Sequence, residues 1–162
     1  MDEIDRKILA CLQEDATMSV TQLAEAVGLS ASPCWRRVRN LEISGVIERR
    51  VTLLNPRALG LGVTVFVSIR TAHHNPKWAE AFCHGIAKIP EVVEFYRMSG
   101  PIDYLLRIVV PDVDGYDLVY KKIINVAELH DVSSSFAIEQ IKYTTALPLN
   151  RIRLSKDTLD ED

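Results

Sequence analysis

Apolar residues before residue 46 recur at intervals of three and four, the spacing that places them on one face of a helix. We expect three helices, over about residues 2–14, 19–27 and 30–44. Ser19 and Gln22 have the spacing of a capping box, in which each side chain bonds the other residue's backbone amide. Gly28 and Gly45 supply the left-handed conformation that commonly ends a helix.

After residue 60 the apolar spacing changes to two, which is typical of strands. The expected elements are a strand at 63–69, a helix at 77–88, strands at 91–98 and 104–110, a helix at 112–126 and a strand at 134–143. Residues 99–101 form a tight turn between the two β-α-β halves. This order predicts a ferredoxin-like α/β sandwich, with both helices on one face of the sheet.

The chain is therefore expected to be α+β. Its first domain, residues 1–60, contains a short extended stretch after the helices, and its second domain covers residues 61–150. A polar tail, residues 151–162, is expected to be partly disordered.

The composition places the chain among ordinary globular proteins. It has 162 residues, of which 48% are hydrophobic and 25% charged, so collagen-like, low-complexity and mainly disordered classes are excluded. No run approaches the roughly 18 apolar residues of a membrane span, and residues 1–5 are acidic rather than signal-like. Three cysteines are too few for a disulfide framework. We expect a soluble protein of a reducing cytoplasm, without membrane attachment.

The net charge of −3 conceals an uneven distribution. Residues 1–32 carry −4, residues 33–57 carry +4 through six arginines and two glutamates, and residues 61–162 carry −3. A local arginine patch is what phosphate contact requires, because counterion release depends on the contacting surface rather than on the total charge. Charge alone leaves a solvated helix face as an equal alternative.

The first two helices predict a helix-turn-helix unit over about residues 20–39. Ala24 is small where the helices would cross, and Gly28 permits the positive φ of the turn. Such a unit places the following helix in the major groove of DNA. A bare helical hairpin is the alternative.

The third helix has two distinct faces. Cys34, Val38 and Leu41 point toward the core, whereas the opposite face carries arginine and asparagine, which can bond guanine and adenine edges. Serines at the helix start suit phosphate contact, and two arginines follow in the extended, wing-like stretch. Trp35, on the flank, is interpreted as a half-buried packing residue rather than a base-stacking one. The candidate DNA contacts are Ser30, Ser32, Arg36, Arg37, Arg39, Asn40, Arg49 and Arg50.

Several stretches together resemble the Lrp/AsnC (leucine-responsive, feast/famine) family of transcriptional regulators. They are Asp5-Arg6-Lys7-Ile8-Leu9, residues 23–30, residues 34–42, Gly45-Val46-Ile47, Leu53-Leu54-Asn55-Pro56 and Gly100-Pro101-Ile102-Asp103-Tyr104. The resemblance implies a winged helix-turn-helix domain joined by a hinge to an α/β-sandwich domain. It also implies dimers that pair through the sheet and often form octamers, with amino-acid effectors bound between dimers.

By position, the resemblance places the effector at the turn of residues 100–104, facing a loop at residues 131–135 of a neighbouring subunit. An amino acid needs an acceptor for its ammonium group, which Asp103 supplies, and donors for its carboxylate, which the Gly100 amide and serine hydroxyls supply. An equal alternative is that Gly100 only makes the turn and Asp103 caps it. Pro101 removes one backbone donor. The candidate effector contacts are Met98, Gly100, Ile102, Asp103, Tyr104, Ser133, Ser134 and Ser135.

No residue pattern indicates catalysis, a metal site or a cofactor. The four histidines and three cysteines lack zinc-ligand spacing, and there is neither a phosphate-binding glycine loop nor a nucleophile elbow. Cys11 and Cys34 fall on helix positions typical of structural thiols. We therefore do not expect an enzyme.

The leading hypothesis is a cytoplasmic regulator that binds a near-palindromic DNA operator as a homodimer or octamer and responds to a small effector, an amino acid. A second hypothesis is a nucleoid-organising protein that wraps DNA with little sequence preference and no ligand response. A third is a metabolite-binding or enzymatic ferredoxin-like domain for which the first domain is only a tether.

Overall fold

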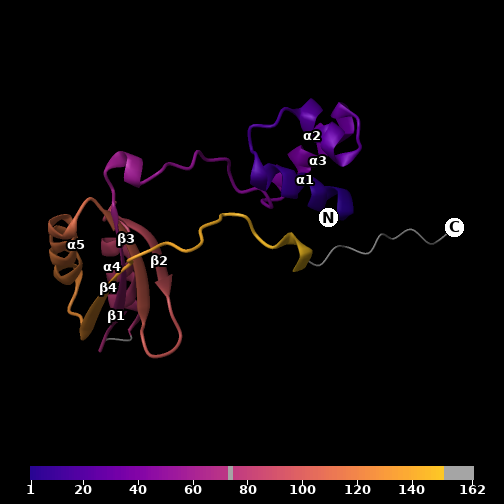
Figure 1. Cartoon of the computed structure of the whole chain (residues 1–162). Coiled ribbons are helices and arrows are strands. Elements are labelled where there is room, and N and C mark those ends of the chain that lie inside the picture. The colour runs from indigo at the N-terminus through magenta and orange to yellow at the C-terminus, as the bar shows by residue number, and fades with distance from the viewer. Residues whose placement is uncertain (73–74, 152–162) are drawn as a thin grey trace. The chain divides into compact units, whose positions relative to one another are not determined.

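The computed structural model describes residues 1–72 and 75–151, and these residues form two compact units (Figure 1). One unit combines Met1–Leu53 with the described residues from Lys142 onward, and the other is Leu54–Ile141. The sequence placed the division near residue 60 and the end of the second domain at residue 150. Most of the expected tail, residues 152–162, lies outside the described residues.

The first unit is built on three helices, α1 (Glu3–Glu14), α2 (Val20–Val27) and α3 (Ala31–Ile43). The predicted capping box at the start of α2 is confirmed, since the Ser19 side chain accepts from the Gln22 amide and the Gln22 side chain accepts from the Ser19 amide. Gly28 ends α2 with φ +74°. Ala24 and Cys34 are buried in the small apolar core that the three helices share.

The extended stretch after α3 contains no regular strand. The predicted helix-turn-helix domain is present, but no described residue between 48 and 56 belongs to a β-strand, so the stretch after it is extended without strand pairing. The apolar residues of this stretch therefore have no strand partner within the described chain. Val51, Leu53 and Leu54 are accordingly 56–68% exposed.

The second unit is the predicted ferredoxin-like sandwich. Its elements are β1 (Val63–Arg70), α4 (Pro76–Ile86), β2 (Val92–Arg97), β3 (Tyr104–Val110), α5 (Val113–Val126) and β4 (Asp131–Phe136). The sheet has the order β2-β3-β1-β4, and every neighbouring pair of strands is antiparallel.

The core of the second unit lies between the sheet and the two helices. Strand alternation turns Val65, Val67 and Ile69 of β1 toward Phe82 of α4 and Ile123 of α5, and all five side chains are fully buried. The residues between them on β1, such as Phe66, point to the opposite face. One face of the sheet is thus covered by helices within the chain, and the other is not.

The last strand begins and ends earlier than expected. We predicted residues 134–143, but β4 spans Asp131–Phe136. It pairs with β1 from Arg70↔Asp131 to Val65↔Phe136, and β1 itself begins only at Val63. The sheet edge therefore ends, and apolar residues beyond it, including Ile138 and Ile141, are more than 90% exposed.

The chain then returns to the first unit. The Gln13 side chain on α1 donates to the Leu147 carbonyl at 3.3 Å and accepts from the Leu147 amide at 2.7 Å. Leu149, in the short 3₁₀ helix η2 (Leu149–Arg151), packs against the core of the three helices. Among the described residues, no helix has both the length and the apolar character to cross a membrane.

Candidate functional site

The third helix exposes the polar face that its sequence predicts. Cys34, Val38 and Leu41 are buried, with at most 7% of each residue accessible, which fixes the rotation of α3. Because a helix turns by about 100° per residue, the residues opposite this stripe face solvent. The structure brings four of the candidate DNA contacts onto this exposed face: Ser32, Arg36, Arg39 and Asn40.

The exposed arginines differ in the ion pairs that they form. Arg39 lies 3.6 Å from Glu42 and Arg50 lies 3.2 Å from the same carboxylate, and both pairs are open to solvent. Such pairs contribute about 0–1 kcal/mol, so a phosphate or a base can replace Glu42 at little cost. Arg36 and Arg49 form no ion pair with any residue in the described part of the chain.

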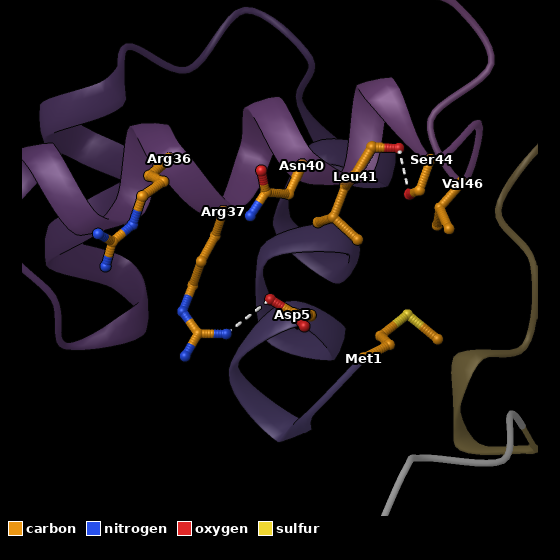
Figure 2. Close-up of a pocket in the computed structure, with 8 residues that line it drawn as sticks. All are labelled: Met1, Asp5, Arg36, Arg37, Asn40, Leu41, Ser44 and Val46. Atoms are coloured by element: carbon orange, nitrogen blue, oxygen red, sulfur yellow. Dashed lines mark hydrogen bonds and ion pairs between the residues drawn. The ribbon is translucent and has the colours of Figure 1, made fainter.

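Arg37 differs from the other candidates because it ties α3 to the start of α1. Its Nη1 atom lies 2.7 Å from an Asp2 oxygen. The same atom lies 2.8 Å from an Asp5 oxygen, the pair drawn in Figure 2. The same two aspartates form the capping box of α1, each accepting a hydrogen bond from the other's amide at 2.9 Å. Arg37 therefore has a structural role within the domain.

Replacing Arg37 with methionine is expected to destabilise the first unit by about 1 kcal/mol near neutral pH, since it leaves two neighbouring carboxylates without their cation. The Asp5 amide and the Arg37 guanidinium hold the pKa of Asp2 below its usual value. A carboxyl with a lowered folded pKa contributes stability above its unfolded pKa of about 3.9 and loses it as pH falls through the folded value. The difference between variant and parent should therefore shrink below about pH 4.

Urea unfolding of the purified protein at pH 7 and pH 3 measures this effect. Arg36→Met is the matched control, because it removes the same charge one position earlier from a side chain with no such partners. Equal stabilities of the two variants at pH 7 would contradict the structural role of Arg37.

A hollow of about 590 Å³ opens beside the exposed polar face of α3, between α1 and the second half of α3. Arg36, Arg37 and Asn40 extend along one side of it, and Leu41 and Val46 supply apolar surface (Figure 2). Met1, Asp5 and Ser44 complete the lining.

Two further residues of this region were assessed from the sequence. Ser30 is the N-cap of α3, and its side chain makes no capping hydrogen bond. Trp35 is 57% exposed and is not among the residues packed against the core of the three helices, so its expected packing role is not seen. The indole instead adds an aromatic surface next to Arg36.

In the second unit, Asp103 holds the turn between β2 and β3 in place. Its carboxylate accepts from the Thr71 amide at 2.8 Å, its amide donates to the Ile69 carbonyl at 2.9 Å, and its carbonyl accepts from the Met98 amide at 2.8 Å. Gly100 has φ +130°, which only glycine adopts readily. Both residues therefore help to form this turn.

The other effector candidates separate in space. Tyr104 is 4% exposed and lies in an aromatic cluster with Phe82, whose ring centroid is 5.0 Å away, and burial raises the pKa of its phenol. The three serines lie on β4 rather than in a loop, so their side chains alternate. Ser134 hydrogen-bonds the Tyr116 hydroxyl on the helix side, while Ser133 and Ser135 point away from it.

A pocket of about 200 Å³ lies at the end of β2 and the start of α4. Met98, Asp103 and Tyr104 line it, together with residues that the sequence did not single out: Thr71, Asn75, Pro76, Ala79 and Arg97. A second, more open hollow of about 370 Å³ shares Thr71 and Asp103 and adds Arg70, Gly100 and His130. Ile102 and the three serines line neither pocket.

The pocket at β2 carries opposite charges. Arg97 provides a guanidinium and Asp103 a carboxylate, and Met98, Ala79 and Tyr104 add apolar surface. No group of three or more metal-ligating side chains occurs within residues 1–72 and 75–151. His73 and His74 lie outside the described residues.

Comparison with known proteins matches both units to family models. Residues 1–42 match the AsnC-type helix-turn-helix domain, and residues 64–147 match the Lrp/AsnC ligand binding domain. The DNA-binding transcriptional activator DecR of Escherichia coli is 51% identical over 150 residues, which are 92% of this chain and 99% of DecR.

Solved structures with the same fold include regulators of this kind. An AsnC family transcriptional regulator from Agrobacterium tumefaciens superimposes with a TM-score of 0.90 and 59% identity, over 93% of this chain and 98% of that one. A transcriptional regulator of Neisseria meningitidis, in complex with L-methionine, gives a TM-score of 0.88 and 34% identity, over 93% and 97% of the two chains.

Proposed function

This chain belongs to the Lrp/AsnC family of transcriptional regulators, and we propose that it reads DNA through α3 and senses an amino acid through the pocket at the end of β2. The observation that supports the DNA-binding part is the outward face of α3. Arg36, Arg39 and Asn40 lie there together, exposed, on a helix whose opposite face is locked into the core. Arginine and asparagine are the side chains that bond guanine and adenine edges bidentately.

Around this reading face, other candidates contact the phosphate backbone. Ser30 and Ser32 lie at the start of α3, where hydroxyls and unpaired amides favour an anion. Arg49 and Arg50 follow in the exposed stretch after α3. These contacts position the protein without selecting sequence.

The pocket at β2 suits a zwitterion. The Arg97 guanidinium pairs with the ligand carboxylate, and the remaining acceptor capacity of the Asp103 carboxylate receives the ammonium group. A volume of about 200 Å³ equals that of roughly seven liquid waters, which suits a single amino acid rather than a larger metabolite. The N. meningitidis relative, crystallised with L-methionine, supports this ligand class.

The uncovered face of the sheet supports self-association. Phe66 and Tyr96 are 39% and 50% exposed on this face, although each belongs to a paired strand of the sheet. A second copy that covers them gives a homodimer with two reading heads, and therefore a near-palindromic operator. Assembly of dimers into an octamer is the further step that the family resemblance implies. The mass of the purified chain in solution tests both levels.

A thermal-shift screen of the purified chain against the twenty amino acids tests the sensing role. A ligand at a hundredfold excess over its dissociation constant adds about 2.7 kcal/mol, which raises the unfolding midpoint visibly. We expect one amino acid, or a few related ones, to stabilise the protein, and Arg97→Ala to weaken that ligand about tenfold or more, because a charged hydrogen bond is lost.

Arg70→Ala is the matched control, since it removes the same charge from the neighbouring hollow. Asp103→Ala is less informative because the Thr71 amide also depends on that carboxylate. A panel in which no amino acid shifts the midpoint, or an equal loss with Arg70→Ala, would contradict this assignment of the pocket.

A further inference from the structure

We propose that the acidic residues 157–162 of this chain bind the arginine-lined hollow beside α3 and compete there with DNA. This inference rests on the proposed reading of DNA by α3. The segment reads Asp-Thr-Leu-Asp-Glu-Asp, with four carboxylates and no basic residue. It lies outside residues 1–42 and 64–147, which the family models match.

The first supporting observation is where the described chain ends. The paired hydrogen bonds of Gln13 to Leu147 and the packing of Leu149 hold this part of the chain against the three-helix unit. Figure 2 shows η2, in dull yellow, on the Met1 and Val46 side of the hollow. Eleven residues, 152–162, follow η2, and an extended chain of that length spans up to about 36 Å. The hollow is therefore within reach.

The second observation is the chemistry of the hollow. Arg36 has no acidic partner among the described residues. The Asp5 carboxylate also lines the hollow, but it is paired with Nη1 of Arg37. The other guanidinium donors of Arg37 bind no described residue. Leu41 and Val46 add an apolar wall. An acidic segment with a single leucine, Leu159, matches both properties.

The same groups explain why the tail and DNA exclude each other. Arg36 and Asn40 line the hollow and also belong to the face proposed to read base edges. A carboxylate on Arg36 occupies the donors that a guanine or a phosphate would use. Because the tail is part of the chain, its local concentration is high, and weak ion pairs suffice to compete.

Neutralising three tail carboxylates tests the proposal. The variant carries Asp160→Asn, Glu161→Gln and Asp162→Asn, and the control carries Glu80→Gln, Asp117→Asn and Glu139→Gln, three exposed acids of the second unit. We expect the tail variant to bind a random-sequence 30-base-pair duplex about three- to tenfold more tightly than the control at low salt. The difference should fall as salt rises and screens the competing ion pairs.

Combining the tail variant with Arg36→Ala separates docking from general repulsion of DNA. Docking on the hollow predicts that most of the gain disappears once Arg36 is absent, whereas an unchanged gain would overturn the proposal. Equal affinities of the tail and control variants would also overturn it. Neither result concerns the reading role of α3, which fails separately if Arg36→Ala alone leaves DNA binding and sequence preference intact.

Discussion

Arg36→Ala is expected to weaken binding to the preferred DNA site by about 1–3 kcal/mol, a loss of about five- to 150-fold, and to relax base preference at one position of each half-site. The reason is geometric. Arg36 is exposed on the face of α3 opposite Cys34 and Val38. It forms no ion pair with a described residue that would compete with a contact to DNA. The measurement is selection of sites from random duplexes, followed by titration of the selected and scrambled duplexes with both proteins.

Arg49→Ala provides the contrast, because this arginine lies outside the helix and is proposed to contact phosphate only. It should weaken all duplexes alike and make the salt dependence shallower by about one unit of slope. An Arg36→Ala protein that selects the same sites as its parent would show that another element reads the bases. Identical behaviour of the two variants would mean that α3 contacts only the backbone.

The helices of the first unit were predictable because their signals are local. Ser19 and Gln22 are three residues apart, and Gly28 follows the last buried residue of α2 directly. Each signal acts within one turn of the helix, so no knowledge of the tertiary fold is needed. The same holds for the inward stripe of α3, which its spacing alone locates.

Contacts between distant segments were not predictable in the same way. Arg37 meets Asp2 and Asp5 across more than thirty positions of sequence, so the sequence grouped it with its neighbours on α3 as a DNA contact. The end of β4 depends on where β1 begins, since a strand continues only where it has a partner. The alternating apolar residues beyond Phe136 therefore predicted a strand that continues past the point where β4 stops pairing with β1.

The pocket at the end of β2 combines a feature that the sequence predicted with one that it did not. The turn at residues 100–104 was found from its resemblance to a family motif, but Arg97 enters the pocket through pairing of β2 with β3, where Arg97 lies opposite Tyr104. The strand itself was predicted, yet nothing local distinguishes this arginine from others on the surface. The three serines of β4 were grouped as a loop, whereas strand alternation sends Ser134 to the opposite side of the sheet from Ser133 and Ser135.

Gly85→Ala is expected to destabilise the second unit by about 1–3 kcal/mol, although alanine is favoured over glycine within helices by about 1 kcal/mol. A Cβ at position 85 would lie 2.3 Å from Cγ1 of Val126 and 3.2 Å from its Cγ2, so α4 and α5 meet there without space for a methyl group. Valine is stiff at χ1 and cannot easily turn away. Urea unfolding in a Trp35→Phe background measures this, because fluorescence of Trp78 then reports on the second unit alone.

Val126→Ala supplies the test of mechanism. Alone it removes partly buried methyl groups and should be destabilising, whereas with Gly85→Ala it removes the atoms that the new methyl group meets. The double variant should therefore be more stable than the sum of the two single effects predicts, with a coupling of about 1 kcal/mol or more. Additive effects would mean that the helices move apart freely and that the close approach at Gly85 does not constrain their packing. A positive coupling would establish that the glycine in the last turn of α4 is retained for helix–helix contact.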